Sequence, residues 1–333
     1  MKTGKSSILP IFAAVFMGIF SFLFLYVGES MERVFSLSAA EEIAHENPLP
    51  GEKEEISAEP ETPAPENEAD ENADNSSFMR LRTNSSGKLI ALETSSVPYV
   101  SQDGEISVTI IGAVHLGEEA YYKELNEHFK DFEVVLYEVV AEEGTRPAKS
   151  GKSSGVIGTV QRQMAAVLQL KFQLEEINYS PENMVHADMT PAEFQEAMEN
   201  RNENFLKLYL RSVGYSLAAQ NLAELKGEVK PIPVHELLFG KNRSLTLKRI
   251  MAEEMGNLEN SILPIEGKDG SAILTDRNAK VLKILREQLD AGKKNIAIFY
   301  GAAHLPDFAR NLESEFQLKP GKARWLKAWD LEK

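Results

Sequence analysis

The chain contains the stretch Val108-Thr-Ile-Ile-Gly-Ala-Val-His-Leu116, and it nearly repeats that stretch as Ala297-Ile-Phe-Tyr-Gly-Ala-Ala-His-Leu305. Each copy is an apolar run typical of a β-strand, ends in Gly-x-x-His-Leu and leads into a segment with a helical pattern. A glycine at a strand end lets the backbone turn sharply, so the histidine after it faces the open end of the sheet. The two copies therefore predict that His115 and His304 meet in one pocket.

The remaining patterns place these two copies in an α/β fold. A helical segment of about residues 155–258 separates them, and it includes the capping box Thr190-Pro-Ala-Glu193 with proline at the first helical position. We therefore predict a mixed central sheet interrupted by a helical insertion. The segments expected to form strands are residues 79–83, 89–94, 106–112, 133–139, 295–300 and 324–330, and those expected to form helices include 118–129 and 272–290.

The first forty residues predict export from the cytoplasm. The uncharged run Ile8–Val27 follows Lys2 and Lys5, and about 20 apolar residues cover the ~30 Å hydrocarbon core of a membrane. The run is longer than the core of a usual signal peptide, which favours an uncleaved anchor, although Ser38-Ala-Ala40 offers a cleavage site. The lysines place that end in the cytoplasm, so residues 1–40 are expected to leave the remainder outside, either membrane-tethered or secreted.

The acidic charge of the chain belongs mainly to one segment. The net charge is −15 at pH 7, and residues 41–77 hold thirteen acidic residues and one lysine. This segment has too few large apolar side chains to offset its ordering entropy, so we expect a disordered acidic spacer, with an acidic docking tail as the alternative. No basic patch with interleaved aromatics suggests nucleic-acid binding. The absence of cysteine excludes disulfides and thiolate metal ligands.

Three residues of the predicted strand ends carry potential chemistry. His115 and His304 are each expected at a helix N-terminus, where the helix dipole disfavours imidazolium and keeps the ring ready for metal ligation or base catalysis. The alternative is that each histidine only caps a turn. Glu138 follows an apolar strand, and a carboxylate there needs a partner, a metal or water. If strands 106–112 and 133–139 are parallel neighbours, Glu138 lies beside His115.

Arg277 and Asn278 occupy core-facing positions of the helix expected at 272–290. Arg277 shares a helical stripe with Val281, and a guanidinium among core positions needs an acidic partner. Glu138 or a substrate carboxylate would serve. The alternative is an arginine at the helix edge with its charged end in water.

The other polar candidates are weaker. His186 and Asp188 precede the capped helix and are the remaining residues that could approach the site. His235-Glu begins the zinc-binding pattern His-Glu-x-x-His, but Phe239 stands where the second histidine is required. His128 is expected on the polar, surface-facing side of its helix.

Taken together, these motifs resemble the TraB/TIKI/PrgY family. No single motif is specific, but their order and spacing are, over about residues 100–310. The matching motifs are Gly112-Ala-Val-His115, Tyr137-Glu138, Asp276-Arg277-Asn278 and Gly301-Ala-Ala-His304.

The resemblance implies an α/β fold of two related halves with a helical insertion, grouped with erythromycin-esterase-like and haem-binding ChaN-like proteins. Animal members are membrane-anchored, metal-dependent peptidases that act outside the cell, and plasmid-borne members shut down peptide pheromone signalling. Many bacterial members have no established activity. This chain departs from the animal branch in its lack of cysteine and in its acidic spacer.

The leading hypothesis is a divalent-metal-dependent hydrolase, with a peptidase favoured, in which His115, His304 and Glu138 surround zinc, manganese or cobalt. Arg277 would orient Glu138 or neutralise an oxyanion. Two alternatives stay open: a metal-free hydrolase with His115 as general base, and a non-catalytic binder of a peptide signal or haem-like ligand. The supporting residues in this hypothesis are Gly112, Gly301, Asn278, Tyr137 and Asp188.

Overall fold

The computed structural model describes residues 78–147, 165–204, 207–208, 211, 234–256, 266 and 270–332. These residues form an α/β fold around an eight-stranded mixed sheet, which confirms the predicted class. The predicted membrane segment and acidic spacer lie outside the described residues. Among the helices that are described, none has the length and apolar character needed to span a membrane.

The main sheet has the order β1-β2-β3-β8-β5-β7, with β9 and β10 also paired to β2. The strands are β1 (Met79–Thr83), β2 (Leu89–Val100), β3 (Ser107–Ala113), β4 (Leu116–Gly117), β5 (Val134–Tyr137), β6 (Lys171–Phe172), β7 (Met184–His186), β8 (Asn295–Gly301), β9 (Lys319–Pro320) and β10 (Arg324–Asp330). The helices are α3 (Glu119–His128), α5 (Gln173–Glu176), α6 (Pro191–Asn200), α8 (Val234–Phe239), α9 (Arg243–Gly256), α11 (Arg277–Asp290) and α12 (Leu305–Ser314), with short turns η2 (Phe129–Asp131), η3 (Ala272–Asp276, a π-helical turn) and η4 (Ala302–His304).

The two Gly-x-x-His strands are direct neighbours at the centre of the sheet. β8 runs parallel to β3, with Ala113 opposite Gly301, and parallel to β5, with Tyr137 opposite Phe299. The condition under which Glu138 would lie beside His115, that strands 106–112 and 133–139 are direct neighbours, is not met, because β8 lies between them. β8 is apolar on both faces, as a central parallel strand requires. All three strands end at the same edge of the sheet.

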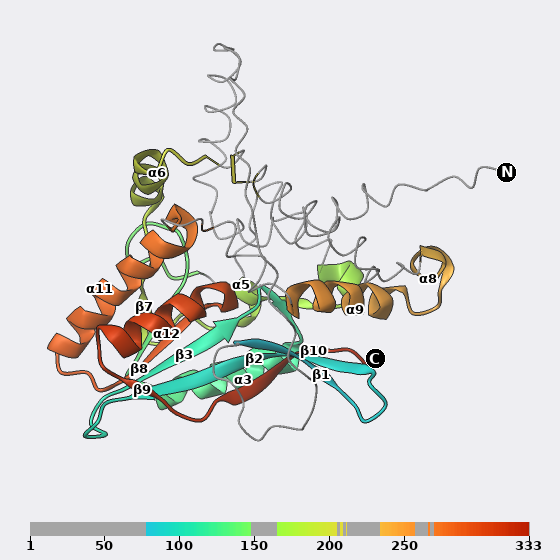
Figure 1. Ribbon diagram of the computed structural model, residues 1–333, viewed down its shortest axis with the longest axis horizontal. Helices are drawn as coiled ribbons and strands as arrows, with labels where there is room; N and C mark the ends of the chain where they lie inside the picture. Colours follow the sequence, from blue (N-terminus) through green and yellow to red (C-terminus); the bar gives the residue numbers. More distant parts are fainter. Residues whose placement is uncertain are drawn as a thin grey trace, which may run out of the picture.

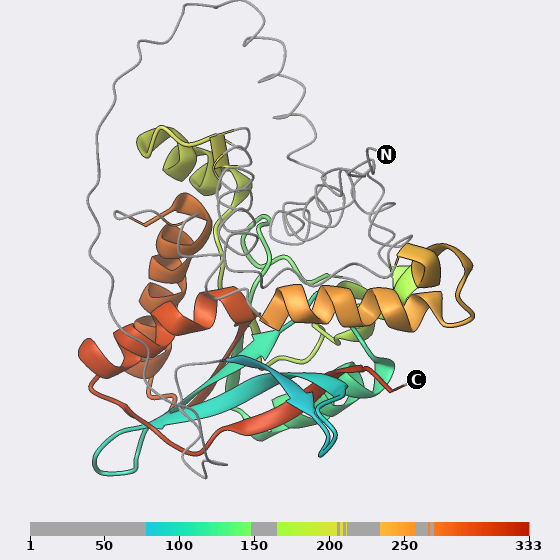
Figure 2. The same cartoon turned by 45° about the vertical axis from the view of Figure 1, so that its right-hand side comes forward.

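Helices cover both faces of the sheet, and β8 contributes to both cores. Its alternating side chains place Phe299 in a cluster with residues of α3 and α9, and Ile298 in a second cluster with residues of α11 and α12. Figures 1 and 2 show α11 and α12 on one side of the sheet and α3 on the other. The central strand is thereby held from both sides, which gives the residues at its end a rigid base.

The helical insertion expected at about 155–258 is not confirmed. The described part of this region includes helices α6, α8 and α9, but it also includes β7, which pairs with β5 in the main sheet. Three residues are too few to produce a recognisable strand pattern, which explains why the sequence did not predict β7. The capping box of α6 is confirmed: the Thr190 hydroxyl accepts from the backbone N–H of Glu193, and the Glu193 carboxylate accepts from that of Thr190.

Candidate functional site

The site is built where β5 and β8 end side by side. Glu138 directly follows β5, and His304 lies three residues after Gly301, the last residue of β8, at the N-terminus of α12. The backbone N–H of Gly301 donates to Oε2 of Glu138 over 2.7 Å, which ties the two strand ends together. The predicted position of His304 at a helix start is confirmed.

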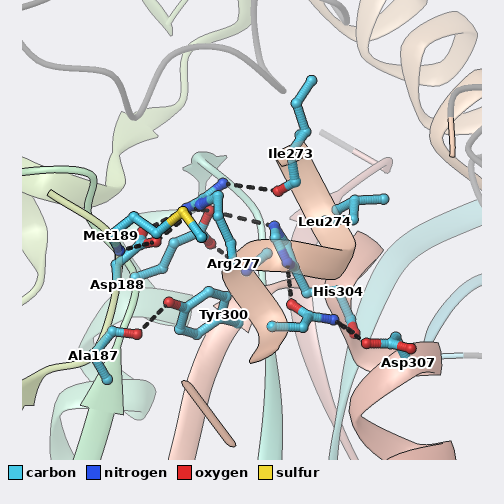
Figure 3. Close-up of polar contacts among 12 residues, drawn as sticks. Ala187, Asp188, Met189, Ile273, Leu274, Arg277, Tyr300, His304 and Asp307 are labelled. Atoms are coloured by element: carbon cyan, nitrogen blue, oxygen red, sulfur yellow. Dashed lines mark hydrogen bonds and ion pairs between the residues drawn. The ribbon is translucent and has the colours of Figure 1, made fainter. Parts of the chain in front are cut away.

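Arg277 lies between two buried carboxylates. Its Nη2 donates to Oε1 of Glu138 (2.7 Å) and to Oδ2 of Asp188 (2.5 Å), and its Nε donates to Oδ1 of Asp188 (2.9 Å). All three side chains are at most 5% exposed. Figure 3 shows Arg277 with Asp188 on one side and His304 on the other. The acidic partner predicted for Arg277 is thus Glu138, together with Asp188.

The ring of His304 is held by Asn278. The Asn278 amide nitrogen donates to Oδ2 of Asp307 (2.8 Å) and to the backbone carbonyl of His304 (3.2 Å), so its oxygen is the group that meets Nδ1 of His304 at 2.6 Å. Because that oxygen can only accept, Nδ1 carries the proton. In the neutral ring, Nε2 therefore keeps its lone pair.

Burial and ion pairing fix the charges of the cluster. Burial lowers the pKa of His304 to about 3, so the ring is neutral at pH 7. Burial alone would raise the pKa of Glu138, but the Arg277 guanidinium, followed by His304, His115 and the Gly301 N–H, outweighs burial and holds this pKa at about 2. Burial raises the pKa of Asp188, against the opposing effect of Arg277. The predicted neutrality of His304 is therefore matched, but burial is its first cause.

These assignments leave two acceptors facing each other. Nε2 of His304 lies 3.6 Å from Oε1 of Glu138, and one atom carries a lone pair while the other belongs to an ionised carboxylate. No hydrogen joins them in this protonation state. Such an arrangement favours a cation or a donor at that place.

His115 belongs to the same cluster but is held differently. It is only partly buried, and it interacts electrostatically with Glu138 and Arg277. The expectation that it begins a helix is wrong, because β4 intervenes before α3 starts at Glu119. Burial still lowers its pKa, and the negative charge of Glu138 opposes this effect.

The remaining supporting residues, Gly112 and Tyr137, do not belong to the cluster itself. Gly112 is buried, and its carbonyl accepts from the hydroxyl of Tyr121 over 2.9 Å. Tyr137 is buried, but its hydroxyl donates to the carbonyl of Thr145 in the loop after β5. Tyr137 therefore supports that loop and does not reach Glu138 through its hydroxyl.

The other histidines lie outside the cluster. His186 holds the loop after β5, because its Nε2 forms a hydrogen bond with the Val139 carbonyl over 2.7 Å. His235 is exposed on α8. The surface position expected for His128 is wrong, because its ring packs on Phe132 and bonds with the Ser96 hydroxyl of β2 at 3.1 Å.

Three residues that complete the site were not predicted from the sequence. Asp307, one turn after His304, holds Asn278, and its position in the first turn of α12 is the signal that could have indicated it. Tyr300 donates from its hydroxyl to the carbonyl of Ala187 and so ties β8 to the residue before Asp188. Gln173 contacts His115 from a segment with no distinguishing pattern.

The described residues include no group of three or more histidine, aspartate or glutamate side chains arranged to hold a metal ion. Two of the three predicted donors, His304 and Glu138, do face each other, with His115 nearby. Comparison with known proteins adds nothing to this geometry: no family model, no curated protein and no solved structure matches the chain.

Proposed function

We propose that this chain is a divalent-metal-dependent hydrolase whose site is formed by Glu138, His304 and His115. The observation that carries the proposal is the pair of facing acceptors, Oε1 of Glu138 and Nε2 of His304. A carboxylate oxygen and an imidazole lone pair are both donors that zinc, manganese and cobalt accept.

The 3.6 Å separation of these two atoms favours a metal over a bridging water. Two metal–ligand bonds of about 2.0–2.1 Å that meet at a tetrahedral angle place their donors about 3.4 Å apart. A water that hydrogen-bonds to both atoms at about 2.8 Å, with the same angle, would place them about 4.6 Å apart. The observed spacing is much closer to the first value.

The charge of the cluster supports the same proposal. Two carboxylates, Glu138 and Asp188, face the single guanidinium of Arg277, and both imidazoles have lowered pKa values. The neighbourhood therefore has an excess of negative charge and two neutral nitrogen donors. A divalent cation would neutralise this excess.

Each chain residue has a definite task in this proposal. Arg277 orients Glu138, because its Nε and Nη2 are engaged by the two carboxylates and its Nη1 reaches the carbonyl of Ile273 at 3.5 Å. This geometry favours the orienting role over the stabilisation of an oxyanion. Asn278 keeps the proton on Nδ1 of His304. The bound ion would supply Lewis acidity for water and for a substrate carbonyl.

Peptides are the substrate class that we propose to test first. The support is the resemblance of the paired Gly-x-x-His motifs to the TraB/TIKI/PrgY family. On the same resemblance, we propose that the domain lies outside the cytoplasm and that the N-terminal segment lies at the membrane.

The metal content of the purified full-length chain tests the proposal. After incubation with zinc, manganese or cobalt and removal of free ions, the wild type is expected to keep a stoichiometric ion. The variants Glu138→Gln and His304→Ala are expected to lose most of it, because each removes one of the two facing donors.

His235→Ala is the matched control, since it removes an exposed histidine of α8 and is expected to keep the ion. A wild type that stays metal-free, or an unchanged content in His304→Ala, would overturn the metal site. Bound metal without cleavage products from a peptide library, as read by mass spectrometry, would favour a binding protein.

A metal-free hydrolase is the second candidate. The observation that favours it is the partial exposure of His115, whose lowered pKa leaves it neutral and able to take a proton from water. Activity that persists in excess chelator and is lost in His115→Ala would select this candidate.

A further inference from the structure

We propose that two tyrosines of α3 and one tryptophan of β10 are positioning residues for His115, because they fix the backbone of the turn that carries it. They are Tyr121, Tyr122 and Trp329, and each is at most 1% exposed. They act on the main chain of residues 112–116, the first copy of Gly-x-x-His-Leu. The consequence for the reaction rests on the proposed function, but the contacts do not.

The two motif histidines lie in different backbone settings, although their sequences nearly match. His304 ends the short helical turn η4, in which the N–H of Leu305 donates to the carbonyl of Ala302, and the chain continues directly into α12. The turn that carries His115 leads into the short strand β4 instead. Its carbonyls therefore need donors from other parts of the fold, since a buried carbonyl without a hydrogen bond is costly.

Side chains of α3 supply two of these donors. The Tyr121 hydroxyl donates to the carbonyl of Gly112, and the Tyr122 hydroxyl donates to the carbonyl of Val114, each over 2.9 Å. The two rings pack on each other with their centroids 5.1 Å apart, so a shift of one ring disturbs the other. Neighbouring positions of one helix thus hold the turn at its glycine and at the residue just before the histidine.

Two further donors hold the carbonyls at the histidine and after it. The backbone N–H of Gln173 donates to the carbonyl of His115 over 2.9 Å, and the indole N–H of Trp329 donates to the carbonyl of Leu116 over 2.6 Å. Four of the five carbonyls in residues 112–116 thus accept from α3, α5 or β10. A backbone held at four points in five residues gives the His115 side chain a fixed starting direction.

The residue after each copy of the motif matches these two settings. A Cβ at Gly117 would lie 2.9 Å from Cδ1 of Tyr121 and 3.2 Å from the Tyr122 hydroxyl oxygen, so a side chain there would push the rings away. The corresponding residue of the second copy is Pro306, which suits the first turn of α12. Gly117 thus admits the tyrosines that hold the first turn, whereas Pro306 continues the second turn into its own helix.

NMR of the full-length chain labelled with ¹⁵N-histidine, in excess chelator, tests this proposal. The ring signals are assigned from His115→Ala and His304→Ala. Tyr122→Phe keeps the ring but removes the hydroxyl, so the Val114 carbonyl loses its donor. The ring signals of His115 are expected to shift or broaden in this variant, while those of His304 stay as in the wild type. With metal added, Tyr122→Phe is expected to bind it several-fold more weakly, because one proposed ligand is less well placed.

Tyr99→Phe is the matched control, because Tyr99 is a buried tyrosine of β2 in the core on the other face of the sheet. It should leave the signals of both histidines unchanged. Wild-type His115 signals in Tyr122→Phe, or equal changes at His115 and His304, would overturn the proposal. If Tyr122→Phe does not fold, Tyr121→Phe, which removes the donor to Gly112, decides by the same outcomes. A shift confined to His115 in a protein that retains no metal would support this proposal and count against the metal site alone.

Discussion

Arg277 is the residue on which the charge state of the site depends. Its guanidinium is 3% exposed and contacts both Glu138 and Asp188, and a buried charge of this kind is tolerable only with such partners. The two partners in turn come from separate strand ends. The ionised state of Glu138 follows from this pairing, whereas the lone pair of His304 that faces it follows from burial and from the contact with Asn278.

The pKa values of the site predict acid sensitivity of the metal-free protein. The pKa of His304 is about 3 in the fold and 6.5 in an exposed histidine, so the unfolded chain binds more protons between these values. The free energy of unfolding should therefore fall as the pH is lowered below about 6.5, by at most about 1.4 kcal/mol per pH unit from this residue. Glu138, whose pKa is about 2 in the fold against 4.5, adds to the loss below about pH 4.5.

Urea denaturation in excess chelator at pH 7, 6 and 5 measures the free energy of unfolding at each pH, and so the slope of that free energy against pH. His304→Asn is expected to have a shallower slope than the wild type, while His235→Asn, with an exposed ring, keeps the wild-type slope. Equal slopes in all three proteins would refute the assignment. His115 should contribute in the same direction, since its pKa is also lowered.

At the scale of elements, the strands that the sequence predicted best are those with strong apolar patterns. β1 at 79–83 and β10 at 324–330 have the predicted bounds, and β8 differs by one residue at its end. The order of strands was not predictable in the same way, because β3 and β5 each pair with a strand far along the chain. Neither β7 nor the contact between Gln173 and His115 is marked by a recognisable pattern in the local sequence.

The residues of the site differ in the same way in whether the sequence predicts them. Glu138, Arg277 and His304 were predicted because each stands out from its own element: a charge on an apolar strand, a charge on a core stripe, a repeated turn. Asp307 and Tyr300 do not stand out, since an acid in a first helical turn and an aromatic in a strand are ordinary. Their roles depend on three-dimensional neighbours.

The end of β8 should tolerate an added methyl group less well than the end of β3. A Cβ at Gly301 would lie 3.3 Å from Oε2 of Glu138, which must shift, whereas at Gly112 the nearest atoms lie at 3.4–3.5 Å. Gly301→Ala is expected to weaken metal retention several-fold, because it displaces a proposed ligand. Gly112→Ala is expected to change the free energy of unfolding by no more than about 1 kcal/mol and to retain metal.

Metal retention after dialysis and urea denaturation of both variants check this prediction. Equal metal retention by Gly301→Ala and Gly112→Ala would show that the close approach of Gly301 to Glu138 is not functionally important.

At the scale of the whole molecule, the described fold begins with Phe78. We expect the stability of a truncated chain to depend sharply on whether Phe78 and β1 are kept. Phe78 is 1% exposed, and β1 supplies Arg80 and Arg82 as partners for the buried Glu93 of β2. A chain that starts at Phe78 should keep the core and its ion pairs. A chain that starts at Ser85 loses β1 and leaves Glu93 without these partners.

We therefore expect the shorter chain to be less stable by at least about 3 kcal/mol, through the loss of a buried aromatic and of β1. Thermal denaturation followed by circular dichroism compares the two truncations with the full-length chain. Equal melting temperatures for the two truncations would contradict this assignment of β1 to the core.

The position of β8 between β3 and β5 has a consequence for how the protein is made. Until residues 295–301 have been synthesised, β3 and β5 have no common partner, and each keeps an apolar edge without its hydrogen bonds. The strand that joins these edges also places Gly301 and His304. Closure of the sheet and assembly of the site are thus a single late event, with a high cost in loop closure. A partly synthesised chain is therefore an aggregation risk, and it lacks the assembled site.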